Sequence, residues 1–335
     1  METKKVVIVI FIIIPLIIIS SIAISNPFLV DRAFYRMGFQ EQICFPNSDD
    51  VFQSDNVTNI AVAADFGVTK NSVKTLENIH SSNPEVVLIP GDLSYSTAEE
   101  WIEFAEFMGK TNIYIAFGDA EPMEEREKLL EYYGLNNNYY SFDYENVHFL
   151  SIDTTDEKNE WGIISDDKIQ LNFIRTDLRH AHDDPEIDFT IVIMHLPMYS
   201  SRDGGSFMDM RNELQPIFDL YGVDLVLNGH RHAYERTYPV MFNNTVTDNE
   251  DCSYDDPDGQ IYVTIGTGGA SHSPFKLKHP WSVVQNHNDY GFLNIKLLND
   301  GKTLYGEFVS NTGKVMDAFQ INLNDNSIKN SEDEN

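Results

Sequence analysis

The chain has 335 residues, of which 42% are hydrophobic and 12% aromatic, so it can bury the core of one large α/β domain or of two small domains. Its 23 basic and 53 acidic side chains give a formal net charge of −30, which excludes a general affinity for nucleic acid or for acidic headgroups. We expect an anionic ligand to bind only where local positive charge, such as that of bound metal ions, overrides this field.

The first 25 residues differ in composition from the rest of the chain. Lys4 and Lys5 precede an apolar run over residues 6–24. A charged start followed by about 20 apolar residues predicts a secretory signal or a signal anchor. Ala23-Ile24-Ser25 has small residues at the spacing of a cleavage site. We expect residues 1–25 to be retained as a membrane anchor, or else removed on secretion, and the remainder to lie outside the cytoplasm.

The chain has two cysteines, Cys44 and Cys252. Outside the cytoplasm they can form one disulfide, which fits the predicted export of the chain. Two free, buried thiols are nearly as consistent with the sequence. The cysteine content therefore leaves both states open.

Two further segments lack the periodic apolar pattern of a folded domain. Residues 26–58 contain Pro27 and Pro46 and are predicted to form a spacer. Residues 324–335 are polar and have no aromatic side chain, which predicts a disordered tail. Residues 59–323, between these segments, contain no internal repeat and no second domain boundary, so we predict a single domain there.

Short apolar runs alternate with amphipathic stretches along this domain. The runs are rich in β-branched residues and predict buried strands at 60–64, 86–89, 113–117, 147–152, 190–194, 225–227 and 261–265. The amphipathic stretches predict helices at 72–80, 98–108, 124–133, 167–178 and 212–221. Later runs predict strands at 291–297, 303–309 and 315–321, with a turn at 299–301. Strands alternating with helices indicate an α/β domain.

Polar side chains follow five of these strands at the point where each strand ends. These sequences are Asp65, Gly91-Asp92, Gly118-Asp119, His195 and Gly229-His230-Arg231-His232. In open α/β sheets, ligands bind beyond the carboxyl ends of the strands. We therefore expect these side chains to gather at one edge of a sheet.

Three carboxylates and three imidazoles at one edge crowd together only if cations hold them. Oxygen and nitrogen donors without a thiolate suit iron, manganese or zinc. Six ligands, one of them bridging, suit two ions roughly 3.5–4 Å apart, which clamp the attacking and leaving oxygens of an in-line displacement. The sequence thus predicts a binuclear metal centre.

Four motifs resemble those of the calcineurin-like metallophosphoesterases, and within these most closely those of the purple acid phosphatases. They are Asp65-Phe66-Gly67, Gly91-Asp92-Leu93-Ser94-Tyr95, Met194-His195-Leu196-Pro197-Met198-Tyr199 and Gly229-His230-Arg231-His232-Ala233-Tyr234-Glu235-Arg236. The last motif is the most specific, and the resemblance covers essentially residues 59–323. It implies an α/β fold of the two-sheet αββα sandwich type.

The resemblance also implies a ligand set and an activity. The first metal would be bound by Asp65, Asp92, Tyr95 and His232, and the second by Asp119, His195 and His230, with Asp92 bridging. A phenolate ligand favours Fe(III), so the expected pair is Fe(III) with Zn, Mn or Fe(II). The implied reaction is hydrolysis of a small phosphate ester of the acid phosphatase type, in which a metal-bound hydroxide attacks phosphorus.

The chain departs from the family pattern at the third strand end. The family usually has Gly-Asn-His-Glu or Gly-Asn-His-Asp, and this chain has Gly118-Asp119-Ala120-Glu121. Asp119 keeps an oxygen ligand but adds a negative charge, which weakens the attraction for a dianion. Ala120 cannot protonate a leaving group as the family His does, and loss of such help typically costs about 10²–10⁴-fold in rate.

Other residues offer replacements for the missing His. Glu121 or Asp203 can serve as the acid, and Arg202 can hold a phosphate oxygen. We assign catalytic roles to Asp92, His195 and Glu121. We expect esters with good leaving groups to be preferred, and monoanionic diesters over dianionic monoesters.

Two alternative functions remain open. One is a phosphodiesterase of the same superfamily, and the other is a catalytically impaired metal-binding surface protein, which the missing His favours. The sequence does not define an oligomeric state.

Overall fold

The computed structural model of the chain describes residues 46, 57–109, 111–155, 168–243, 252–272, 274–299 and 301–323. The predicted anchor at 1–25, the predicted tail at 324–335 and nearly all of the predicted spacer at 26–58 lie outside these residues. Within the described ranges, none of the helices combines the length and the apolar character that crossing a bilayer requires. The membrane anchor stays a prediction.

The described residues form two seven-stranded mixed sheets. The first has the order β3-β2-β1-β12-β13-β14-β9, and its strands are β1 (Thr58–Val62), β2 (Val86–Pro90), β3 (Asn112–Ala116), β9 (Ser253–Asp255), β12 (Gly291–Leu298), β13 (Thr303–Ser310) and β14 (Val315–Asn322). The second has the order β11-β8-β10-β7-β6-β5-β4, and its strands are β4 (Tyr140–Tyr144), β5 (Val147–Ile152), β6 (Phe189–Met194), β7 (Leu225–Asn228), β8 (Tyr234–Thr237), β10 (Ile261–Ile265) and β11 (Ser282–Asn286).

Each sheet contains a run of parallel strands. β1, β2 and β3 are parallel in the first sheet, and β5, β6, β7 and β10 are parallel in the second. β1 also pairs with β12 in antiparallel register, Thr58 opposite Leu297, which joins the start of the domain to its last third. The carboxyl ends of the parallel strands are the places where this topology can assemble a site.

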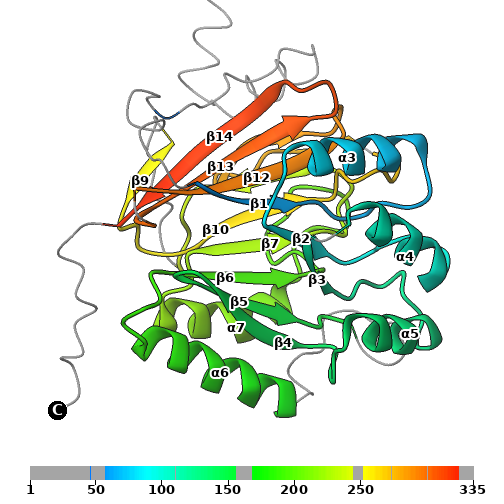
Figure 1. Cartoon of the computed structure of the whole chain (residues 1–335). Coiled ribbons are helices and arrows are strands. Elements are labelled where there is room, and N and C mark those ends of the chain that lie inside the picture. Colours follow the sequence, from blue (N-terminus) through cyan, green and yellow to red (C-terminus); the bar gives the residue numbers. More distant parts are fainter. Residues whose placement is uncertain are drawn as a thin grey trace, which may run out of the picture. The chain divides into compact units, whose positions relative to one another are not determined.

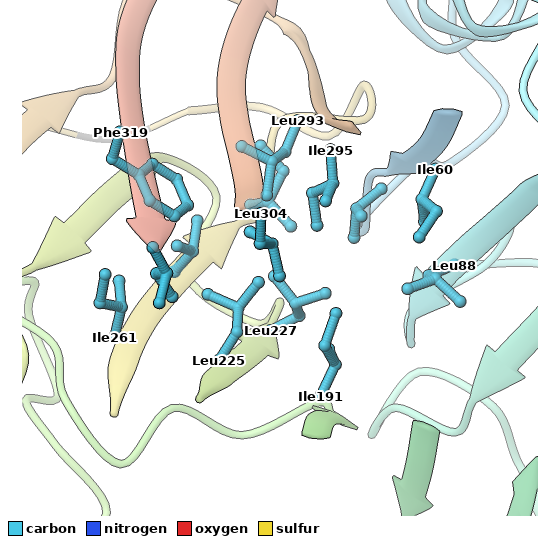
Figure 2. Packing of buried hydrophobic residues seen from close by; sticks show 14 of the residues in the cluster. Ile60, Leu88, Ile191, Leu225, Leu227, Ile261, Leu293, Ile295, Leu304 and Phe319 are labelled. Carbon is cyan, nitrogen blue, oxygen red and sulfur yellow. The ribbon is translucent and has the colours of Figure 1, made fainter. Parts of the chain in front are cut away.

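The main hydrophobic core lies between the two sheets. Ile60 and Leu88 extend from the first sheet towards Ile191 and Leu227 of the second (Figure 2), and all four side chains are fully buried. Alternate residues of the same strands point the other way, as the two-residue period of a strand requires. Ala61 and Val87, for example, belong to a second cluster on the outer face of the first sheet.

Helices cover both outer faces (Figure 1). α3 (Lys70–Ser81), α4 (Ala98–Phe107) and α5 (Met123–Tyr133) pack on the first sheet, and α6 (Lys168–Asp183) and α7 (Met208–Tyr221) pack on the second. Thr69 caps α3 by accepting the backbone N–H of Ser72, and Gly134 ends α5 in a left-handed conformation. The layers therefore follow the order αββα.

The predicted strands at 60–64, 86–89 and 147–152 match β1, β2 and β5 to within two residues at each end. The pattern did not predict β4, β8, β9 and β11 as strands. β8 is fully buried but contains Glu235 and Arg236, so it is not an apolar run. α6 continues to Asp183, five residues beyond the predicted end at 178.

Candidate metal centre

The carboxyl ends of five strands meet, but they belong to two sheets. β1, β2 and β3 lead to Asp65, Asp92 and Asp119, whereas β6 leads to His195 and β7 to His230 and His232. The expectation that these residues lie at one edge of one sheet is therefore wrong. The carboxylates come from the first sheet and the imidazoles from the second, because the two parallel runs face each other across the core.

The first cluster contains Asp65, Asp92 and His232, whose ligand atoms lie within 4.8 Å of one another. His232 Nε2 is 3.3 Å from Asp65 Oδ1. The Tyr95 hydroxyl donates to Asp65 Oδ1 at 2.9 Å and lies 2.7 Å from His232 Nε2. These four residues are the set expected for the first metal.

The second cluster contains Asp119, His195 and His230, again with ligand atoms within 4.8 Å of one another. His195 Nε2 and His230 Nδ1 each lie 2.9 Å from Asp119 Oδ1. His195 Nε2 is also 3.2 Å from Asp92 Oδ1, which connects the second cluster to the first. Asp92 thus occupies the bridging position between the two clusters.

The donor set fits a pair of cations. Asp65 is fully buried, and its Oδ2 atom has no hydrogen-bond partner within the described ranges. A buried carboxylate oxygen without a partner costs a substantial part of its hydration free energy, so such atoms usually face an ion or water. A cation held by Asp65, Asp92 and His232 accounts for this atom.

Four of the expected ligands have backbone conformations that are rare for residues with a side chain. The φ angles of Asp65, Asp92, Tyr95 and His230 are 59°, 53°, 58° and 65°. Left-handed conformations of this kind cost of order 1–3 kcal/mol each and concentrate at functional sites. Each residue directs its side chain back towards the ends of the strands at the cost of local strain.

Gly118 makes room for the bridging carboxylate. A Cβ atom added at this residue would lie 2.1 Å from Asp92 Oδ1 and 2.5 Å from Asp92 N. No side chain is tolerated at such a distance, so this glycine is required by close packing. The same loop supplies a further contact, because the backbone N–H of Ala120 donates to Asp92 Oδ1 at 3.0 Å.

The protein groups of the centre shift one another's pKa values strongly. Burial alone would lower the pKa of His195, but the carboxylates of Asp92 and Asp119 raise it to about 10. Burial, followed by the charges of Asp65 and Asp92, raises the pKa of Tyr95 far above its ordinary value. A strongly charged cation bound close by would favour the deprotonated form of Tyr95.

Glu121, which we assigned as a replacement acid, is buried with both oxygens engaged. Oε1 accepts the backbone N–H of Leu93 at 2.7 Å, and Oε2 accepts those of Gly118 at 2.7 Å and Asp92 at 3.2 Å. Burial and the neighbouring Asp92 raise the pKa of Glu121 to about 7, against the effect of these hydrogen bonds. The carboxylate joins the loops that carry Asp92 and Asp119.

Arg126 of α5 completes this arrangement, and the sequence pattern does not predict its role. Its side chain is 1% exposed; Nε donates to Glu121 O at 2.7 Å, and Nη2 donates to Gly118 O at 2.5 Å. Asp153 balances its charge at 3.0 Å from Nη1. An arginine in an amphipathic helix usually lies at the surface, so the sequence contains no signal for this role.

The other two proposed substitutes occupy different surroundings. Asp203 is exposed and pairs with the exposed Lys276. Arg202 donates from Nη1 to the backbone carbonyl of His232 at 2.6 Å, so its guanidinium lies beside the first cluster.

Comparison with known proteins identifies the class that this fold and site define. A family model described as calcineurin-like phosphoesterase matches residues 58–234, and one described as iron/zinc purple acid phosphatase-like protein C matches residues 259–318. The chain therefore belongs to the calcineurin-like metallophosphoesterases.

Its relatives within this family include purple acid phosphatases. The chain is 30% identical to "Purple acid phosphatase 18" of Arabidopsis thaliana over 271 residues, which cover 73% of this chain and 58% of the relative. It is 33% identical to "Probable inactive purple acid phosphatase 1" of the same plant over 192 residues, 55% of this chain and 30% of the relative. The chain thus spans little more than half the length of the first relative.

Solved structures show the same fold. The purple acid phosphatase PPD1 of yellow lupin (Lupinus luteus) superimposes with a TM-score of 0.69 at 25% identity, covering 81% of this chain and 55% of the lupin chain. A structure described as "GAP50 the anchor in the inner membrane complex of Plasmodium" superimposes with a TM-score of 0.63 at 19% identity, covering 80% and 89%. The second likeness concerns the fold alone.

Proposed function

We propose that the chain is a binuclear metal hydrolase of phosphate esters with acid-phosphatase-like activity. The observation that carries this proposal is the junction of two ligand clusters through Asp92 at the ends of both sheets. Bound there, two cations supply the Lewis acidity that activates water and neutralises charge on the phosphate. Because the chain covers only part of its relatives' length, we assign their activity to this chain only as a proposal.

We assign the ligands as the resemblance implies. Asp65, Asp92, Tyr95 and His232 would hold Fe(III). Asp119, His195 and His230 would hold a Zn, Mn or Fe(II) ion, and Asp92 would be shared by the two ions. The hard oxygen donors beside the first position favour the ferric ion, and the two imidazoles beside the second favour a borderline divalent ion.

The chain's own groups then position the reacting parts. The Ala120 N–H and the Glu121 cradle fix Asp92 and the loop of Asp119. The three N–H donors favour the ionised form of the Glu121 carboxylate, so we propose that Glu121 positions Asp92 and Asp119 instead of donating a proton. The leaving group receives no proton from residue 120, so we propose that esters with good leaving groups, and diesters, react best.

A catalytically impaired protein is the second candidate. Ala120 in place of the usual His favours it, and so does the relative named as a probable inactive phosphatase. The two candidates differ in turnover and not in metal content.

The test uses the full chain, loaded with iron plus zinc or manganese, and an aryl phosphate monoester with the matching diester. We expect turnover that Asp92→Asn abolishes, and a diester-to-monoester ratio above that of a phosphatase with the usual His. If a preparation verified to contain two metals shows no turnover above the Asp92→Asn control, the chain is the catalytically impaired protein.

We also propose that the domain acts outside the cytoplasm. Cys252 is disulfide-bonded, and disulfides persist mainly in oxidising compartments. Cys44, the only other cysteine of the sequence, lies outside the described residues. Thiol labelling of the denatured chain from its native source should find no free thiol, and two labelled cysteines would contradict the proposal.

A further inference from the structure

Arg231 stands between two candidate metal ligands, His230 and His232, in the turn that follows β7. Its guanidinium lies 5.4 Å from the centre of the Phe207 ring, and the same ring contacts the His230 imidazole edge-on, with centroids 5.5 Å apart. His230 Nδ1 lies 2.9 Å from Asp119 Oδ1. One aromatic ring thus connects the guanidinium with a ligand of the second cluster.

The loop after β6 holds the guanidinium in this place. Arg231 Nη2 donates to the backbone carbonyl of Gly205 at 3.0 Å. A Cβ atom at Gly204 would lie 2.7 Å from Nη2 and 3.0 Å from Nη1, so glycine lets the loop approach the guanidinium closely. The positive charge of Arg231 therefore has a fixed position relative to the candidate ligands.

The guanidinium of Arg231 is half-buried, and within the described ranges no carboxylate lies at ion-pair distance from it. Its Nε atom is buried and has no hydrogen-bond partner in those ranges. Asp119 pairs with imidazoles instead, and Asp203 of the neighbouring loop pairs with Lys276. A partly buried cation without a counter-ion in contact is costly, which suggests that its charge acts at longer range.

The charges of Arg231 and Asp119 influence each other without contact. Burial, followed by repulsion from Arg202, lowers the pKa of Arg231. The carboxylates act in the opposite direction, and among them Asp119 has the largest effect, followed by Asp65. The strongest favourable partner of the guanidinium is therefore a candidate metal ligand.

Asp119 is also the position at which the chain departs from the family pattern. An asparagine there would leave the metal-loaded centre one positive charge richer and would attract a phosphate dianion more strongly. Arg231 supplies one positive charge beside the same cluster. The two residues thus have opposite effects on the charge that a substrate meets.

We propose that Arg231 is the counter-charge of Asp119 and offsets the negative charge that Asp119 adds to the second metal position. This inference rests on the metal centre of the proposed function but not on turnover. It has two consequences of opposite sign, because a positive charge repels the bound cation and attracts the phosphate. Arg231 acts through its field, and neither the metal nor the phosphate needs to touch it.

Two other roles are compatible with the same contacts, and each predicts a different result. If Arg231 only fastens two loops, its removal lowers stability and does not strengthen metal binding. If Arg231 is a direct ligand of the phosphate, its removal weakens phosphate binding and leaves the metal affinity unchanged. Only a counter-charge makes the metal bind more tightly when it is removed.

The first measurement is calorimetric titration of Zn²⁺ into the full chain that carries iron alone. Arg231→Gln should bind Zn²⁺ roughly 3–20-fold more tightly at low salt, because it removes a unit charge that repels a doubly charged ion. The gain should shrink at high salt, since ions screen the repulsion. Asp119→Asn should bind Zn²⁺ more weakly than the parent chain, and Arg231→Lys, which keeps the charge, should match the parent.

The second measurement is the binding of orthophosphate to the chain loaded with iron and zinc. Here the signs are reversed: Arg231→Gln should weaken binding by a similar factor, and Asp119→Asn should strengthen it. The double variant Asp119→Asn with Arg231→Gln should return towards the parent value, because the two charges it removes have opposite sign.

Arg211→Gln is the matched control. Arg211 is also partly buried, donates from Nε to Met198 O at 2.8 Å, and lies 3.7 Å from the centre of the Tyr199 ring. Its removal deletes one positive charge and one loop contact without touching a candidate ligand, so both affinities should stay at the parent values. Thermal melts establish that each variant is folded, and Arg231→Met replaces Arg231→Gln if the glutamine disturbs folding.

A Zn²⁺ affinity that is unchanged or lower after removal of Arg231 overturns the inference, and so does an equal gain in Arg211→Gln. These outcomes leave the proposed function intact, because the centre still binds its second ion. A parent chain that binds no second ion would contradict the proposed function and the counter-charge together.

Discussion

The carboxylate of Glu121 shows how surroundings decide the role of a side chain. Three backbone N–H groups from two loops donate to its two oxygens, and each buried N–H group requires an acceptor. Arg126 holds the carbonyls of Gly118 and Glu121 from the other side of the same loop. The loop that carries Asp119 is therefore fixed from both sides before any metal binds.

Replacement of Glu121 tests this positioning role. Glu121→Ala leaves three buried N–H groups without acceptors, and we expect the free energy of unfolding to fall by about 2–4 kcal/mol. The affinity for the second metal should fall as well, because Asp92 and Asp119 lose their support. Denaturant titration and metal analysis after dialysis measure the two effects.

The control for this experiment is Glu124→Gln, which changes an exposed glutamate in the first turn of α5, three residues after Glu121. It should leave stability and metal content close to those of the parent chain. If Glu121→Ala kept full stability and full metal content and lost only activity on poor leaving groups, Glu121 would be the general acid after all.

Ala120 offers a second prediction at this scale. Ala120→His restores a proton donor next to the loop of Asp119, and we expect turnover of alkyl monoesters to rise by about 10²-fold or more. Aryl esters with good leaving groups should gain much less, since their departure needs no proton. Parallel kinetics on both esters measures the difference.

Ala120→Gln is the control, because it adds polar bulk without a titratable group. An equal gain for both esters in Ala120→His would contradict the explanation. So would an unmodified chain that already hydrolyses alkyl esters as fast as aryl esters.

Among the secondary-structure elements, His148 joins three. It lies on β5, and its Nδ1 and Nε2 atoms are 2.7 Å from Asp143 of β4 and 2.9 Å from Asp177 of α6. Burial lowers the pKa of His148, but the two carboxylates outweigh burial and leave the pKa above its ordinary value. The protonated imidazole thus ties the edge of the second sheet to its covering helix.

The sign of the pH dependence follows from this pKa. A group whose pKa is higher in the folded than in the unfolded state contributes its full stabilisation at pH values below its unfolded-state pKa, which is 6.5 for histidine. This contribution is lost as the pH rises through the folded-state pKa. We expect His148→Gln to cost about 1–3 kcal/mol at pH 5.5 and clearly less at pH 9.

Thermal melts of both proteins across this pH range, scored as a difference between parent and variant, measure the effect. His180→Gln, on an exposed face of α6, is the control and should show no such trend. A cost that stays constant with pH would mean that His148 is neutral in the fold and acts only through packing.

Elements also show what the sequence can and cannot predict. β2 is a continuous apolar run, Val86–Pro90, buried on both faces, so its pattern alone identifies it. β8 is equally buried, but it consists of Tyr-Glu-Arg-Thr and depends on partners elsewhere in the chain. A local pattern indicates burial only through hydrophobic residues. It cannot indicate that a charged residue is buried when its partner lies some 80 residues away in the sequence.

The same limit applies to the candidate site. The predicted ligands could be collected from strand ends, because parallel strands place their carboxyl ends together. Strand order could not be deduced, so the division of carboxylates and imidazoles between two sheets was not foreseen from the pattern. Arg126 had no sequence signal, because no local pattern shows that an arginine of a helix is buried and donates to the carbonyls of Gly118 and Glu121.

Over the whole molecule, charge is distributed unevenly. A net charge of −30 makes most of the surface repel an anionic substrate. Two bound cations would form the local exception, at the end of the sandwich where the two sheets present their ligands. This arrangement concentrates attraction for an anion at the place where the chemistry is proposed to occur.

The two sheets are also joined through a buried ion pair inside the core. Arg236 of β8 donates from Nε and Nη2 to the Asp317 carboxylate of β14 at 2.6 and 3.0 Å, and both side chains are 0% exposed. Tyr234 donates its hydroxyl to the same carboxylate at 2.7 Å. β8 follows His232 directly in the sequence. The ion pair therefore links β14 of the first sheet to the strand of the second sheet that comes just after this candidate ligand.

Breaking this pair should destabilise the whole sandwich rather than one loop. Arg236→Met leaves the Asp317 charge buried without its partner, so we expect a loss of about 3–5 kcal/mol in the free energy of unfolding. The double change Arg236→Met with Asp317→Leu should recover most of this loss, because an apolar pair removes the unpaired charge. Arg175→Met, which removes an exposed ion pair with Glu213, should change stability by less than about 1 kcal/mol. Denaturant titration of the disulfide-bonded full chain measures the free energy of unfolding of all three variants. If the double variant is no more stable than Arg236→Met, the pair contributes through its specific geometry instead of through charge balance.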